Sequence, residues 1–131
     1  MNLNRSVTYG MIAMGHIARQ TDAPWVQTEE ISDKYNLPND YLLKIMNHLV
    51  RAGLLRGKRG PHGGFSLAKP AKEISLLEII EAVEGSIKNY YEIAQQAKKQ
   101  KYAVKMDEIC SKAADQAIAI LKKAKLSDLV K

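Results

Sequence analysis

The order of two helical patterns and a basic hairpin between residues 28 and 67 constrains this fold more than any other feature. The hairpin is the stretch LLRGKRGPHGGFSL of residues 54–67, in which two apolar runs flank a tip rich in glycine and proline. Such a tip lets the chain reverse, so the pattern predicts a two-stranded turn. From Arg51 to Lys72 there are six basic residues and no acidic one. This charge suits a surface that lies against phosphate, with a solvated basic loop as the alternative.

Two helical patterns precede the hairpin. Thr28 is the predicted N-cap of a short helix that buries Ile31 and Tyr35. After Asn36-Leu37-Pro38 a longer amphipathic pattern follows and ends at Gly53. Its apolar stripe has i, i+3, i+4, i+7 spacing and consists of Leu42, Ile45, Met46 and Leu49. A short helix, a tight turn, a longer helix and a hairpin together predict a helix-turn-helix followed by a wing.

Further elements flank this unit. Apolar residues at helical spacing predict a first helix from about Arg5 to Gln20, after which Trp25 and Val26 are expected to complete the core. Beyond the wing, the capping box of residues 75–78 predicts a helix that Gly85 ends, with Ile74 and Ile79 as its hydrophobic staple. The polar, lysine-rich stretch of residues 86–104 fits either a hinge or a solvated helix.

The C-terminal part predicts one more helix, from Met106 to Ala124, whose apolar and small residues keep to one broad face. Such a face needs a partner. We expect it to form a homodimer, with packing back on its own domain as the alternative. The expected interface residues are Ile109, Ala113, Ala117, Ile120 and Leu121.

Composition limits the classes of protein that remain. A chain of 131 residues suits one domain with one modest core. The net charge is +6, but residues 1–85 hold ten basic and nine acidic side chains, so the case for nucleic-acid binding depends on the local basic run. A single cysteine excludes an intrachain disulfide framework and a multi-cysteine zinc site. With neither a run of about 20 apolar residues nor a signal peptide, we expect a cytoplasmic protein.

Six segments carry a family resemblance. They are residues 37–42, LVRAGLL (49–55), RGPHGGF (59–65), LAKP (67–70), ISLLEIIEAVEG (74–85) and LSDLV (126–130). In combination they resemble the Rrf-two family of bacterial winged-helix regulators, the family of IscR, NsrR and CymR, over nearly the whole chain. The resemblance implies a mainly α fold: a winged helix-turn-helix domain with a two-stranded β-wing and a long C-terminal dimerisation helix. It also implies that the recognition helix enters the major groove and the wing arginine the minor groove.

Arg59 matches that wing arginine, and an arginine gains from the enhanced negative potential of a narrow minor groove. Leu43 stands where iron-sulfur relatives carry a polar base reader. Since leucine can pack on a thymine methyl but cannot donate or accept a hydrogen bond, the operator should differ from theirs. His62 replaces a glycine of the wing tip and either contacts phosphate or faces solvent.

The expected DNA-binding residues divide by role. Asp40 and Lys44 would face the groove, whereas Thr28 and Arg51 would contact phosphates. The full set is Thr28, Asn39, Asp40, Tyr41, Leu43, Lys44, Arg51, Lys58, Arg59 and His62.

The sequence departs from cluster-bearing relatives, which place three cysteines between the capped helix and the dimer helix as soft ligands for iron. This chain has none there, and Cys110 falls where relatives commonly carry a tryptophan. Thr8 and Ile12 stand where some members supply a carboxylate or histidine ligand. We therefore expect no cofactor and no metal site. His16 and His48 are expected to be packing or surface residues because no ligand partner recurs near them.

Two features leave alternatives open. Cys110 is either a small apolar residue of the helix or, given thiolate character, a redox sensor. The lysines where the cluster loop would be form either a solvated face or a site for an anion or an acidic partner; they are Lys98, Lys99, Lys101 and Lys105.

The sequence thus predicts a winged helix-turn-helix domain at residues 1–85, a hinge or loop at 86–105, and a dimerisation helix and tail at 106–131. We expect a homodimeric repressor that binds a dyad site on double-stranded DNA without an iron-sulfur cluster. Its signal would be a small molecule, an acidic protein partner as in the CymR branch, or oxidation of Cys110. The alternative is a protein-interaction module that kept the fold but lost operator binding. An enzyme is not expected, because no catalytic constellation is present.

Overall fold

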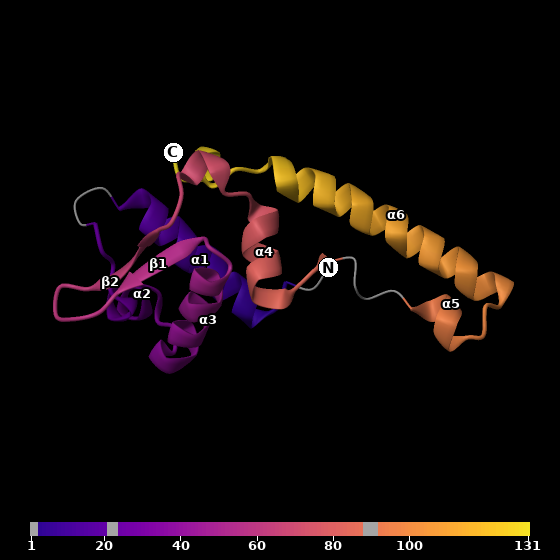
Figure 1. The fold of residues 1–131 in the computed structure, drawn as a ribbon, viewed down its shortest axis with the longest axis horizontal. Coiled ribbons are helices and arrows are strands. Elements are labelled where there is room, and N and C mark those ends of the chain that lie inside the picture. The colour runs from indigo at the N-terminus through magenta and orange to yellow at the C-terminus, as the bar shows by residue number, and fades with distance from the viewer. Residues whose placement is uncertain (1–2, 21–23, 88–91) are drawn as a thin grey trace.

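The computed structural model describes residues 3–20, 24–87 and 92–131. As the resemblance implied, it is mainly helical, with a two-stranded antiparallel wing and a long C-terminal helix that projects from the body of the molecule (Figure 1). None of the described helices combines the length and apolar character needed to cross a bilayer. The elements are α1 (Arg5–Arg19), α2 (Thr28–Tyr35), α3 (Asn39–Arg51), β1 (Leu55–Lys58), β2 (Gly64–Leu67), η1 (Ala71–Glu73), α4 (Leu76–Glu84), α5 (Ile93–Gln96), α6 (Lys101–Lys123) and α7 (Leu126–Leu129).

The first helix, α1, begins and ends within one residue of its predicted bounds. Asn4 caps it, because its side-chain oxygen accepts a hydrogen bond from the Val7 amide at 3.0 Å. Gly10 lets α1 approach α4 closely, since a Cβ there would lie 3.1 Å from Cγ2 of Val83. The helix therefore packs against α4 along its buried face.

The helix-turn-helix unit forms as predicted, apart from one cap. The α2 helix ends at Tyr35 with Asn36 as its C-cap, and the left-handed backbone of Asn36 (φ 54°) lets the Leu37 amide donate to the Ser32 carbonyl at 2.9 Å. The predicted stripe of α3 (Leu42, Ile45, Met46, Leu49) is buried in the core. The prediction of Thr28 as the N-cap is wrong: Gln27 occupies that position, and the Thr28 side chain is turned into the protein with 5% of its surface exposed.

The wing consists of β1 and β2 in antiparallel register, from Leu55 opposite Leu67 to Lys58 opposite Gly64. Val26 adds a third short segment to the ribbon, because it exchanges hydrogen bonds with Phe65 at 2.9 and 2.8 Å. Val26 completes the core as expected, but the same prediction for Trp25 is wrong. Successive residues of an extended chain face opposite sides, so Trp25 lies half-buried on the outer face of the ribbon.

The capping box before α4 is confirmed. The Ser75 hydroxyl accepts from the Glu78 amide and the Glu78 carboxylate accepts from the Ser75 amide, both at 3.1 Å. The staple residues Ile74 and Ile79 are fully buried, and Gly85 ends the helix with a φ of 90°. Burial of the Glu78 carboxyl acts to raise its pKa. The hydrogen bonds from Lys69 and Ser75, with the charge of Lys69, outweigh this, so that the pKa of Glu78 lies below its ordinary value of 4.5.

The C-terminal helix is longer than predicted, since α6 begins at Lys101 rather than at Met106. The stretch expected to be a hinge or a solvated helix contains the short α5 and the first turn of α6, while residues 88–91 lie outside the described part. Asp107 of α6 holds α5 in place, because its carboxylate accepts from the amides of Ile93 and Ala94 at 3.1 and 2.8 Å.

The chain returns to the winged-helix body after α6. The Leu76 amide bonds to the Ala124 carbonyl at 2.9 Å, and the Leu126 amide bonds to the Ile74 carbonyl at 2.8 Å. Leu126 is 3% exposed and belongs to the same core cluster as the stripe of α3. A second cluster, made of Val7, Ile80, Ile87 and Ala114, joins α6 to α1 and α4.

Candidate nucleic-acid interface

The face of α3 opposite its buried stripe is open to solvent. Leu43 has 41% of its surface exposed and stands among polar neighbours. This outer face consists of Asp40, Leu43, Lys44, Asn47, His48 and Arg51. Asn47 was not among the predicted residues, although its helical spacing of three from Lys44 and four from Arg51 would have identified it. An amide here has the donor and acceptor that an adenine edge requires.

The N-terminal end of α3 is fixed to α1 by Tyr41. Its ring packs edge-to-face on Tyr9, with centroids 5.7 Å apart, and its hydroxyl hydrogen-bonds to that of Ser6. Tyr41 was predicted to contact DNA, and the structure gives it a packing partner and a hydrogen-bond partner within its own chain. Asn39 is half-buried, and its Oδ1 has no hydrogen-bond partner among the described residues.

The wing tip presents Arg59 and His62 to solvent, and its close turn depends on glycine. A Cβ on Gly63 would lie 2.0 Å from the Lys58 carbonyl oxygen, and one on Gly64 would lie 2.5 Å from that of Val26. The Gln27 side-chain amide donates to the Pro61 carbonyl at 3.2 Å. The tip is therefore tied to the N-terminal end of α2.

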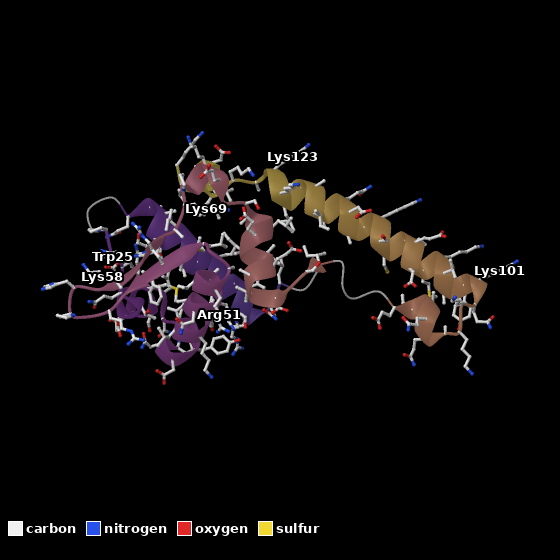
Figure 2. The ribbon with its side chains drawn as sticks, in the orientation of Figure 1. Trp25, Arg51, Lys58, Lys69, Lys101 and Lys123 are labelled. Carbon is white, nitrogen blue, oxygen red and sulfur yellow. The ribbon has the colours of Figure 1, made fainter. Side chains whose placement is uncertain are left out.

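Between α2 and the wing tip there is a hollow of about 280 Å³, which Thr28 and Glu29 line together with Gly60 and Gly63. Thr28 is mostly buried here, whereas Arg51 and Lys58 are exposed. The α3 helix and the β1–β2 wing lie at the end of the molecule away from α6 (Figure 1). Arg51 on α3 and Lys58 on the wing mark the two parts of this surface in Figure 2.

The two histidines outside the wing differ in environment, as expected for packing and surface residues. His48 is exposed, but His16 is 8% exposed and connects α1 to α2. Its Nδ1 lies 3.0 Å from the Tyr35 hydroxyl, and its Nε2 lies 2.6 Å from Oε2 of Glu30. His16 thus packs the helix-turn-helix unit against the first helix.

The apolar residues of α6 divide between two faces instead of the single face expected. Ala114, Ile118 and Leu121 pack in the second core cluster of the same chain. Ile109 and Ile120 are 68% and 70% exposed on the other face, and Ala113 is exposed beside them. Two of the residues expected at a dimer interface therefore have other surroundings. Leu121 packs against the core of its own chain, and Ala117 lies half-buried between the two faces.

The side chains of this chain do not fit an iron-sulfur cluster. Such clusters are held mainly by cysteine thiolates, and Cys110 is the only cysteine in the sequence. It is half-buried on α6. Within the described ranges, no group of three or more histidine, cysteine, aspartate or glutamate side chains could hold a metal ion. The four lysines of residues 98–105 are all exposed.

Comparisons with known proteins agree with this architecture. A putative HTH-type transcriptional regulator of Aquifex aeolicus is 37% identical over 81 residues, covering 62% of this chain and 56% of the relative. The HTH-type transcriptional regulator IscR of Cereibacter sphaeroides is 36% identical over 89 residues, covering 66% of this chain and 57% of the relative. The chain therefore matches little more than half the length of these relatives.

Among solved structures, CymR, the global cysteine regulator of B. subtilis, matches with a TM-score of 0.77 at 24% identity. The match covers 99% of this chain and 96% of CymR, and it shows a common fold. The model of the family Rrf2, described as "Iron-dependent Transcriptional regulator", matches residues 3–131. A match of that extent shows that this chain belongs to the Rrf2 family of transcriptional regulators.

Proposed function

We propose that this chain is a sequence-specific DNA-binding regulator that acts as a homodimeric repressor on a dyad operator. The observation that carries the proposal is the exposed polar face of α3 together with the exposed basic wing, two elements that both lie at the end of the molecule away from α6 (Figure 1). In a twofold dimer, two α3 helices enter major grooves about one helical turn apart, ~34 Å. The two copies of Arg59 enter the adjacent minor grooves.

The residues of the surface divide by the contact that each would make. Asp40, Lys44 and Asn47 carry the polar groups for base edges, while Leu43 packs on a thymine methyl. Phosphates are contacted by Arg51, by Lys58 and His62 of the wing, and by the N-terminal end of α2 at Thr28. Tyr41 fixes the start of α3 against α1, so it acts on DNA through the position of that helix. Asn39, the first residue of α3, is proposed to contact DNA directly.

The exposed stripe of α6 is the proposed dimer contact. Its apolar members stand out from the helix on the side that their own domain leaves uncovered. Burying a fully exposed isoleucine contributes about 1.5–3 kcal/mol, so a few such residues on two helices can hold a dimer together.

The regulator is proposed to work without an iron-sulfur cluster, because the chain offers one thiolate where a cluster requires several. It acts in the cytoplasm and has no enzymatic activity of its own. Its signal is a small molecule, an acidic protein partner or oxidation of Cys110.

The experiment selects bound fragments of the source genome with purified protein and then titrates the best site with salt. We expect a dyad motif, with affinity that falls steeply as salt rises. Arg59→Ala should weaken specific binding by roughly 1–3 kcal/mol, the cost of losing one good base or groove contact, while sedimentation shows an intact dimer. If the Arg59→Ala variant bound the operator with unchanged affinity, the proposed minor-groove contact of Arg59 would be wrong.

One observation favours a second candidate, a protein-interaction module on the same fold. Leu43 exposes an apolar side chain at the centre of α3, where a base reader would be polar. This candidate requires that selection recovers no motif and that Arg59→Ala changes nothing measurable. Leu43→Ala would then weaken a protein complex and leave DNA binding unaffected.

A further inference from the structure

The outer face of the wing carries an aromatic ring with two cations over it. The guanidinium carbon of Arg56 lies 5.4 Å from the centroid of the Trp25 ring, and Nζ of Lys58 lies 5.6 Å from it. Figure 2 shows Trp25 and Lys58 close together at the wing. A cation over an exposed tryptophan face gains about 0.5–1 kcal/mol, so both side chains are held in place.

Strand register explains why these three side chains meet. Val26 pairs with Phe65, which places Trp25 opposite Ser66, and Ser66 is in turn paired with Arg56 on β1. The next row carries Lys58 opposite Gly64. Because β2 presents only serine and glycine on this face, the long cationic side chains of β1 can reach across it to the indole.

The two cations have no carboxylate partner among the described residues. The ion pairs within residues 3–20, 24–87 and 92–131 include neither Arg56 nor Lys58. Glu30 lines the same hollow of about 520 Å³ as Lys58 and Trp25, but its carboxylate is bonded to Nε2 of His16. Two positive charges over one ring repel each other, and an anion placed between them would relieve that repulsion.

We propose that Trp25, Arg56 and Lys58 form a platform that binds phosphodiesters of the DNA backbone. The proposal rests on the proposed function and adds a contact surface on the face of the wing turned away from the core. Lys58 directly precedes Arg59, so a strand bordering the minor groove that Arg59 enters would pass over the platform. Trp25 is the positioning residue, because its ring holds the cations ready and reduces the side-chain entropy lost on binding.

The central experiment measures the salt dependence of DNA affinity for the double variant Arg56→Gln/Lys58→Gln. Each lost phosphate contact lowers the slope of log affinity against log salt by about 0.9, so the expected decrease is about 1.8. Affinity for the operator and for random DNA should fall by the same factor, since phosphates carry no sequence information. The matched control is Lys101→Gln/Lys122→Gln, which removes the same charge from exposed positions of α6 and should keep the wild-type slope.

A second readout comes from the ring itself, since Trp25 is the only tryptophan in the sequence. Its emission should change as DNA is added to the wild-type protein, and much less in the double variant. Trp25→Phe, which keeps a ring for the cations, should retain most of the affinity that Trp25→Ala loses.

Three results would overturn the platform. An unchanged slope in the double variant, with Arg59→Ala still weakening operator binding, would remove the platform and leave the proposed function in place. Absence of binding to any DNA would overturn both. A saturable emission change with inorganic phosphate, at ionic strength matched with chloride, would assign the site to a small anion instead.

Discussion

The turn at the wing tip can form only because Gly63 has no Cβ atom. The Lys58 carbonyl oxygen occupies the space in which any other residue would place its Cβ. Gly64 faces the same restriction from the Val26 carbonyl, and its φ of 141° also lies in the region that favours glycine. The shape of the tip that presents Arg59 is therefore set by close backbone contacts at these two glycines.

Gly63→Ala should lower the free energy of unfolding by about 1–3 kcal/mol, because the β1 carbonyl must move or the backbone must accept strain. Urea denaturation followed by circular dichroism measures this. The control is Gly57→Ala in β1, where a Cβ makes ordinary contact with the Phe65 ring at 3.6 Å and should change stability by less than about 0.5 kcal/mol. Equal effects at the two positions would contradict the argument.

At the residue scale, sequence patterns predicted buried positions better than outward ones. The stripe of α3 was identified because helical periodicity records which face is apolar. The outward position of Trp25 was missed, since it depends on the pairing of Val26 with Phe65, residues far apart in the sequence. Asn47 was missed although its spacing from Lys44 and Arg51 was available in the sequence.

Among the elements, α4 shows how a local sequence pattern can determine both a boundary and a pH response. Glu78 accepts from the Ser75 amide and also pairs with Lys69 at 2.6 Å. Its folded-state pKa lies below the ordinary 4.5, so the unfolded chain binds more protons in that range. The resulting stabilisation is complete above pH 4.5 and is lost as pH falls through the folded-state pKa.

Glu78→Gln should remove this pH response while its amide oxygen keeps the capping bond. Urea unfolding is measured from neutral pH downward. Above pH 4.5 the wild type should unfold at a higher urea concentration than the variant, and this difference should shrink at lower pH. Glu73→Gln, at an exposed position of η1, is the control for removing one carboxylate. A difference that stays constant across the titration would contradict the assignment.

Element boundaries were predicted where a capping residue marks them. The end of α3 and both ends of α4 follow from such residues. The start of α6 was missed by five residues. Its first turn, residues 101–104, buries only the small side chain of Ala103 and leaves Tyr102 and Val104 exposed, so no apolar stripe marks it. Gln100, its N-cap, makes no side-chain cap hydrogen bond that could have marked it.

At the scale of the whole molecule, α6 has one face for its own domain and another that is open. The open stripe follows alternating steps of four and three residues, as in a coiled-coil seam. It consists of Tyr102, Met106, Ile109, Ala113, Gln116 and Ile120. The division between the two faces could not be predicted from the sequence, because only the position of α4 shows that Leu121 is already in contact with its own core.

Ile109→Glu/Ile120→Glu should convert the proposed dimer to a folded monomer, because charges on the seam cannot be buried without partners. Sedimentation velocity measures the oligomeric state, and circular dichroism verifies the fold. Lys122→Glu changes the net charge by the same amount at an exposed position away from the seam, so it should remain dimeric. A double variant that sediments as a dimer would place the contact elsewhere.

The pairing of Ser75 with Lys125 has a consequence for the order in which the protein folds as it is made. Chains emerge from the ribosome at about 5–20 residues per second, and early segments usually fold first. Here the core around the recognition helix includes Leu126, so its packing cannot be completed until the whole of α6 has been synthesised. The winged-helix body must therefore persist in an incomplete state during translation, with its Ile74 edge exposed, until Leu126 arrives.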